Sequence, residues 1–275
     1  HERYIDRGVP TENGEPVERF EKITFGGNDN LTTLKANILR ATLSKQFSDT
    51  RKGNLSVVSS DFEKMYKNYY ASGYTAGASV VTMDGYLDPT ERENTIISGS
   101  MVNEVGKHTL LVGAELIDTT NNNHRYNTFW STTSDDNEVF TITRPMNFTV
   151  NSAGVATNND FTADLKSKTK SDIDVTSIYI QDQIDVSDKL KLMIGGRHDS
   201  FDITVTDIKA GSAQSRKDSK FSPRAGVIFK PQDNISWYYS YSESFLPRSG
   251  EQYKKLTASA AALDPDVYES SEVGV

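Results

Sequence analysis

Residues 173–199 read IDVTSIYIQDQIDVSDKLKLMIGGRHD, with apolar and polar side chains alternating on both sides of a short polar turn at 186–188. After this turn, Leu190, Leu192 and Ile194 fall on one face of an extended chain. Arg197 and Asp199 fall on the opposite face, because successive side chains of a strand point to opposite sides. The stretch is typical of an antiparallel β-hairpin with one apolar and one polar face.

The same pattern recurs along the chain, and its connections differ in length. Short connections at 48–54, 103–107, 186–188 and 231–234 alternate with long polar ones at 67–90, 119–172, 207–219 and 246–267. Between them, alternation predicts strands at 33–47, 54–66, 91–102, 108–118, 173–185, 189–206, 220–230, 235–245 and 268–275. Outer-membrane barrels have tight periplasmic turns and long external loops. We therefore expect 186–188 and 231–234 to face the periplasm and 119–172 to lie at the cell surface.

The composition agrees with a barrel. The chain has 275 residues, of which 36% are hydrophobic, and its mean hydropathy of −0.56 is that of a polar protein. No apolar run approaches the ~18 residues of a spanning helix, but a barrel needs lipid-facing side chains only at alternate positions. The net charge of −8 disfavours a nucleic-acid partner. With no cysteine, disulfides and thiolate metal sites are excluded.

These observations predict an all-β fold, namely a partial antiparallel up-and-down transmembrane β-barrel with about nine strands. The tyrosine-rich stretch with Trp237, Tyr238, Tyr239 and Tyr241 lies near a short turn, as an interfacial aromatic girdle requires. An odd set of strands leaves two unpaired edges, which neither lipid nor water accommodates well. We therefore expect the chain to be a middle part of a larger barrel.

Several blocks of the sequence resemble one known family. They are YSYSESFLPRSGEQY at 239–253, LDPD at 263–266, EVG at 272–274, YIQDQ at 179–183, GGRHD at 195–199, HTLLVGAE at 108–115 and YIDRGVP at 4–10. In this order they are similar to the barrel blocks of TonB-dependent siderophore receptors. The block at 4–10 resembles the catecholate-receptor branch in particular.

The resemblance implies an outer-membrane receptor of a Gram-negative bacterium that imports ferric siderophores for iron acquisition. Such receptors have a plugged barrel of ~22 strands and take energy from the TonB–ExbB–ExbD complex through the plug. The sequence contains no recognisable plug, TonB-contacting box or terminal aromatic strand. We expect residues 1–275 to be a fragment of the barrel domain, with the plug domain and the C-terminal strands absent. The ferric siderophore would be a transported ligand, with no resident cofactor or metal and with outer-membrane lipid around the barrel.

Other functions stay open at this point. The same architecture serves receptors for cobalamin, haem or glycans, and a passive porin-like channel or a structural barrel is a further alternative. An enzyme is not expected, because the four histidines are dispersed and neither a Gly-x-Ser-x-Gly elbow nor a phosphate-binding loop occurs.

Two groups of residues are candidates for function. The first could bind an anionic iron chelate through aromatic faces and cations in external loops, and it consists of Arg125, Tyr126, Trp130, Arg248, Tyr253, Lys254 and Lys255. The alternative for each of these is a solvated loop residue. The second group, Arg197 and Asp199, faces the barrel lumen, where the pair either forms part of a charge ladder within the wall or contacts the plug.

Overall fold

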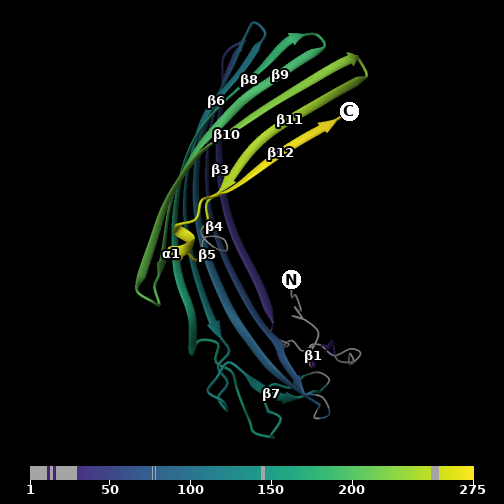
Figure 1. Ribbon diagram of the computed structural model, residues 1–275. Coiled ribbons are helices and arrows are strands. Elements are labelled where there is room, and N and C mark those ends of the chain that lie inside the picture. The colour runs from purple at the N-terminus through teal and green to yellow at the C-terminus, as the bar shows by residue number, and fades with distance from the viewer. Residues whose placement is uncertain are drawn as a thin grey trace.

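The computed structural model describes residues 11–12, 15–16, 30–75, 77, 79–143, 146–248 and 254–275. Most of them form one tall antiparallel sheet that curves into part of a barrel wall, with a convex and a concave face (Figure 1). The short connections lie together at one end of the sheet, and the long connection between β6 and β8 lies at the other (Figure 1). The predicted fold class is therefore confirmed.

The main sheet has ten strands. Nine follow one another from edge to edge in the order β12-β11-β10-β9-β8-β6-β5-β4-β3, and the short β7 pairs with β5. Their bounds are β3 (Leu31–Ser48), β4 (Arg51–Thr75), β5 (Val80–Val105), β6 (His108–Asn127), β7 (Glu138–Thr141), β8 (Asp164–Ser187), β9 (Leu190–Asp207), β10 (Ser212–Gln232), β11 (Ile235–Leu246) and β12 (Asp266–Gly274). The other described elements are the pair β1 (Thr11–Glu12) and β2 (Glu15–Pro16), and the short helix α1 (Ala258–Ala261).

Two of the four predicted long loops are wrong, because the strands continue through them. β4 and β5 occupy most of residues 67–90, and β9 and β10 occupy most of residues 207–219. The predicted loop at 119–172 shortens to 128–163 for the same reason. Outside the apolar zone both faces of a strand carry polar side chains, so the alternation in hydropathy ends although the backbone ladder continues.

The convex face carries the apolar side chains predicted to face lipid. Ile194 is 61% exposed, and Leu192 of the same strand is also exposed. Other exposed apolar side chains on this face are Leu39, Leu43, Leu55, Val57, Ile97, Leu116, Ile178, Ile180 and Phe221. Arg197 and Asp199 line a cavity on the other side of β9, which confirms its predicted faces. A continuous exposed apolar surface of this kind fits lipid acyl chains.

Polar and aromatic residues lie at the two ends of this apolar surface, which we call the apolar band. Toward the long-loop end, Asp118, Asp174 and Asp202 stand in register on β6, β8 and β9. Toward the short turns, Trp237 is 60% exposed on the convex face, as a girdle residue should be. Tyr238 does not belong to the predicted girdle, since it points to the opposite face and donates a hydrogen bond to Glu272 at 2.6 Å.

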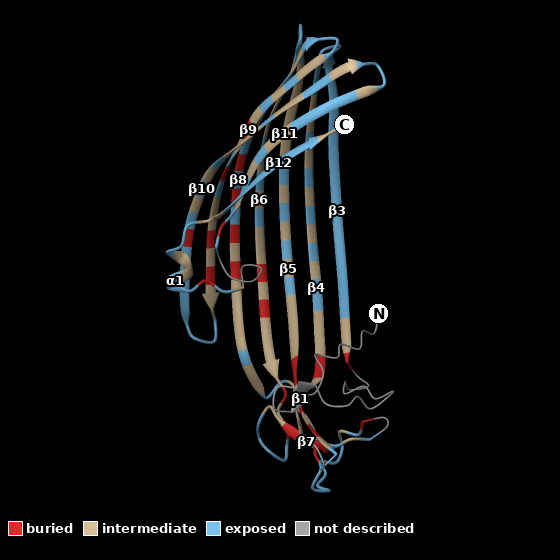
Figure 2. Ribbon diagram, turned by 45° about the vertical axis from the view of Figure 1, so that its right-hand side comes forward, coloured by how far each residue is buried: buried red, intermediate tan, exposed pale blue. Residues whose placement is uncertain are grey.

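Buried residues gather in two places, one around β7 and one beside α1 (Figure 2). Each place is a loop that packs on the strand wall. The only described helix, α1, has four residues, and no helix in the described part of the chain is both long and apolar enough to cross a membrane.

Candidate functional site

The loop at 128–163 has a hydrophobic core of its own. Trp130 is 1% exposed and lies edge-on to Phe140, with ring centroids 4.9 Å apart, while Tyr69 of β4 packs against its other side. Trp130 was predicted to contact a ligand from an external loop. Its burial instead makes it a structural residue of the loop, because a side chain enclosed by other aromatic rings offers no surface to a ligand.

Asp136 in this loop is sensitive to pH. Burial raises its pKa, and the nearby carboxylates of Asp84 and Asp135 add to the effect. A raised pKa in the folded state means that the folded loop binds the proton more tightly than the unfolded chain, so the free energy of unfolding falls as pH rises through the shifted range. We expect the contribution of Asp136 to the stability of the loop to be larger at acidic pH than at pH 7.

Hydrogen exchange of residues 128–163 measures this dependence, and Asp136→Asn should reduce it. Asp160 in the same loop is the matched control, because hydrogen bonds from Thr162 lower its pKa. Asp160→Asn should therefore act in the opposite sense, removing protection at neutral pH. Equal effects of the two substitutions would contradict the opposite directions assigned to the pKa shifts of Asp136 and Asp160.

In the outer part of the concave wall a cation lies on the face of a buried aromatic ring, that of Tyr86, which is 2% exposed. The guanidinium carbon of Arg125 on β6 lies 3.8 Å from the ring centroid of Tyr86 on β5. Arg125 also pairs with Asp88 at 3.3 Å. Tyr66 of β4 extends the aromatic surface, with its ring 5.5 Å from that of Tyr86. A stacked, half-buried guanidinium is well suited to bind an anion or a planar ring.

The predicted neighbours Arg125 and Tyr126 are separated by the fold. They are successive residues of β6, so their side chains point to opposite faces. Arg125 pairs with Asp88 on the concave side, whereas Tyr126 is in register with Leu87. Of the three residues predicted from the longest loop, the structure thus brings only Arg125 to the concave wall.

A small cationic hollow lies on the same wall. Lys64 of β4, Arg92 of β5 and Lys254 of the last long loop line a cavity of about 280 Å³. Arg92 is in register with Asn121 of β6. Asn121 is 1% exposed, and its amide nitrogen and oxygen have no hydrogen-bond partner within the described residues; the Nε of Arg92 has none there either. Buried polar groups normally have partners, so these atoms are exceptions among the described residues.

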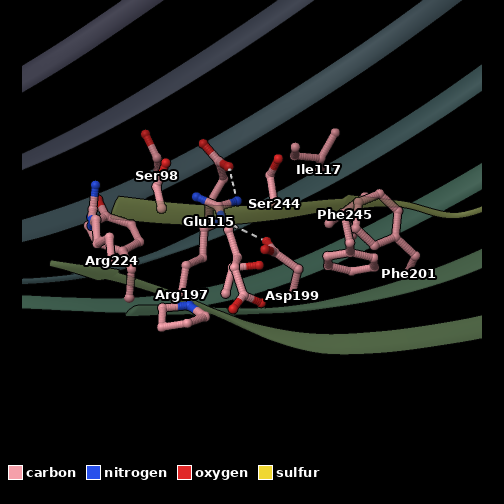
Figure 3. Close-up of a pocket in the computed structure, with 15 residues that line it drawn as sticks. Ser98, Glu115, Ile117, Arg197, Asp199, Phe201, Arg224, Ser244 and Phe245 are labelled. Carbon is pink, nitrogen blue, oxygen red and sulfur yellow. Dashed lines mark hydrogen bonds and ion pairs between the residues drawn. The ribbon is translucent and has the colours of Figure 1, made fainter. Parts of the chain in front are cut away.

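Deeper along the wall, Arg197 forms the centre of a charged cluster (Figure 3). Its guanidinium donates to Glu115 at 2.8 Å, to Asp199 at 2.6 Å and to the Ser177 hydroxyl at 2.7 Å. Ser177 in turn donates to Asp199 at 2.5 Å. The cluster lines a cavity of about 630 Å³. The concave placement of Arg197 and Asp199 agrees with the predicted lumen position, and their contact with a plug stays a prediction.

Two residues of this cluster, Glu115 and Tyr179, were not among the residues predicted from the sequence. Tyr179 lies beside Arg197, with the guanidinium 5.8 Å from its ring centroid. A Cβ on Gly113, which pairs with Tyr179, would come within 2.3 Å of the tyrosine ring, so glycine is required there for the ring to lie across β6. Both Gly113 and Glu115 fall within the block at 108–115, but no local spacing relates that block to Arg197.

The residues predicted from the last long loop separate in the structure. Arg248 forms an ion pair with Asp266 at the base of the loop. Lys254 reaches the cationic hollow, Lys255 is exposed, and Tyr253 lies outside the described residues. Among the described residues, no group of three histidine, aspartate or glutamate side chains is arranged to hold a metal ion.

Comparisons with known proteins agree with this geometry. Residues 4–275 match the family described as TonB dependent receptor-like, beta-barrel. The ferrichrome outer membrane transporter/phage receptor of Escherichia coli K12 is 31% identical over 144 residues, which cover 52% of this chain and 18% of the relative. The probable TonB-dependent siderophore receptor PiuA of Acinetobacter baumannii is 30% identical over 111 residues, covering 37% of this chain and 15% of that protein.

Solved structures show the same fold. The crystal structure of PiuA from Acinetobacter baumannii superposes with a TM-score of 0.77 at 18% identity, covering 98% of this chain and 42% of that one. This chain therefore spans less than half of the solved receptor. Because the family match extends over nearly all of the sequence, the chain belongs to the TonB-dependent receptor β-barrel family, which lies in the outer membrane of Gram-negative bacteria.

Proposed function

We propose that the intact protein binds ferric siderophores in the outer part of its barrel and takes them up with energy from the TonB–ExbB–ExbD complex. The observation that carries this proposal is the concave wall itself. In a chain of net charge −8, Arg125 stacks on the buried ring of Tyr86, and the cations Lys64, Arg92 and Lys254 line a hollow on the same wall. Many iron chelates are anionic, and a wall that carries these cations attracts them.

The length of the relatives supports the proposed partners. This chain covers 42% of the solved PiuA structure, and we propose that the intact protein has a plug domain through which the TonB complex acts. The outer-membrane lipid would surround the convex face. The concave wall offers groups that can bind a ligand, so we infer a transport receptor and not an enzyme. The ferric siderophore would be its cargo, and we infer no resident cofactor.

Growth assays test this function. An iron-starved, receptor-null strain that carries the intact gene should grow when fed at least one ferric siderophore, and this growth should require an intact TonB system. A porin-like channel would support growth independently of TonB. A receptor for cobalamin, haem or glycans would support growth on that ligand and on none of the siderophores.

A pair of neighbouring substitutions tests the wall. Arg125→Ala removes the cation stacked on Tyr86 and should weaken binding of the transported chelate roughly tenfold. Tyr126→Ala is the matched control, because this side chain points to the opposite face of the same strand. Titration of purified receptor with the chelate measures both affinities. Equal losses from the two substitutions, or none from Arg125→Ala, would remove this wall from the binding site.

A further inference from the structure

Arg216 on β10 uses all of its hydrogen-bond donors within the described structure. Its Nε and one Nη donate to the two carboxylate oxygens of Asp218 at 2.5 and 2.6 Å. Its remaining donors reach three backbone carbonyls of the last long loop, those of Arg248 at 2.8 Å, Ala260 at 2.9 Å and Leu263 at 2.9 Å. The guanidinium and its carboxylate partner are nearly inaccessible, with side chains 6% and 8% exposed.

Apolar contacts complete the attachment of this loop. Leu256 is 6% exposed and packs in a cluster with Ile173, Val175, Ile203 and Val205 of β8 and β9, and Ala260 and Ala261 of α1 pack against the same cluster. Thr257 caps α1 by accepting a hydrogen bond from the Ala260 amide at 3.1 Å. The loop therefore lies against the concave face, where α1 appears beside β10 (Figure 1).

The attachment determines where Lys254 lies. Only one residue separates Lys254 from the buried Leu256, and a chain of two residues spans at most about 7 Å. Lys254 nevertheless lines the hollow with Lys64 and Arg92, which belong to β4 and β5. We infer that Arg216 is a positioning residue, which holds the last long loop on the concave wall and so completes an anion-binding subsite formed by Lys64, Arg92 and Lys254. This inference rests on the proposed function, because the subsite would bind the transported chelate.

The chemistry of the subsite selects an oxygen-rich anion. Three cationic side chains, those of Lys64, Arg92 and Lys254, line one hollow together with Leu34 and Phe62. Clustered cations with a guanidinium bind carboxylate, phosphate or catecholate oxygens by charge-assisted hydrogen bonds. An uncharged chelate gains little there. The subsite should therefore distinguish ferric chelates by charge, and this selectivity should be lost when the loop is released.

The experiment compares two synthetic hexadentate iron(III) chelates on the intact protein, a trianionic tris-catecholate and an uncharged tris-hydroxamate. Affinity is measured at low and high salt for wild type, Arg216→Ala, Arg216→Lys, Lys254→Ala and the Arg216→Ala/Lys254→Ala double variant. Hydrogen exchange of residues 254–263 reports whether the loop is attached. Lys217→Ala is the matched control, since Lys217 follows Arg216 on β10 and pairs with Asp202 on the convex face.

We expect Arg216→Ala to increase exchange in the loop and to weaken binding of the trianionic chelate by roughly fivefold to tenfold at low salt. Lys254→Ala should cause a similar loss with the loop still attached, and the double variant should lose no more than Arg216→Ala alone. Arg216→Lys keeps the charge but not the planar fork, so it should resemble Arg216→Ala. The uncharged chelate and the Lys217→Ala control should be unaffected.

Two outcomes would overturn the inference. If the loop is released but the affinity for the trianionic chelate is unchanged, Arg216 does not support the subsite. If the losses in the double variant are additive, Arg216 and Lys254 act independently. Failure of the proposed function looks different: wild type would then bind neither chelate, whatever the state of the loop, and a subsite for the transported chelate would be excluded with it.

Discussion

Ile97→Arg is expected to lower the free energy of unfolding of the barrel by about 2–4 kcal/mol. Ile97 is 41% exposed on the convex face of β5 and stands in register with Val57 and Leu116, in the middle of the apolar band. At that depth a guanidinium would lie among lipid acyl chains. Bringing a charge into those apolar surroundings accounts for the size of the effect.

The next residue of the same strand is the control. Ser98 points to the concave side, where it lines the large cavity with Glu115. Ser98→Arg therefore introduces the same side chain one residue away, but into a polar space with a carboxylate opposite. Urea titration of the intact protein folded into lipid vesicles gives both unfolding free energies. Equal costs would show that the two faces of β5 are wrongly assigned.

Arg197→Leu is expected to cost about 1–3 kcal/mol, because it leaves Glu115 and Asp199 without their cation. The upper values for buried ion pairs do not apply, since the Arg197 side chain is 34% exposed. Urea titration of the intact protein gives this cost. Adding Glu115→Gln should recover part of the loss by removing one of the two stranded carboxylates. His198→Ala, on the convex face of the same strand, should change little.

The double variant decides the interpretation. If Glu115→Gln does not rescue Arg197→Leu, the stabilising contribution of Arg197 comes from its packing on Tyr179 and not from charge neutralisation.

The alternation in β9 was sufficient to predict its two faces, because one side of that strand contacts lipid and the other does not. Alternation did not predict the parts of the strands that lie outside the apolar band. Outside it, β4 and β5 carry polar residues on both faces and apolar residues at successive positions such as Val80 and Val81, so their hydropathy has no two-residue period that distinguishes a paired strand from a loop. Strand length there depends on backbone pairing between segments, which leaves no periodic signal in either segment.

The candidate site shows the same limit. Arg125 could be selected by residue type, but its partner Tyr86 is placed by the register of β5 against β6. Trp130 is a residue type that often contacts ligands, but it lies in the core of a loop. Only the packing of Phe140 against it distinguishes a core residue from a ligand contact. Glu115 reaches Arg197 across β8, through two strand registers that the sequence alone does not specify.

The length of the β4–β5 hairpin has a consequence for what the cell displays. From Asp61, at the edge of the apolar band, to Thr75, where β4 ends, about 14 residues rise ~45 Å along the strand, or roughly 35 Å along the membrane normal at a barrel tilt near 40°. If the short turns face the periplasm as predicted, the folded module at 128–163 lies on this hairpin outside the bilayer. We expect a bulky particle such as an antibody to meet that module first, whereas a small chelate could reach Arg125 beside it. If the intact protein binds its chelate at the concave wall as proposed, macromolecules and the chelate would meet separate sets of residues, and one set could vary while the other is kept.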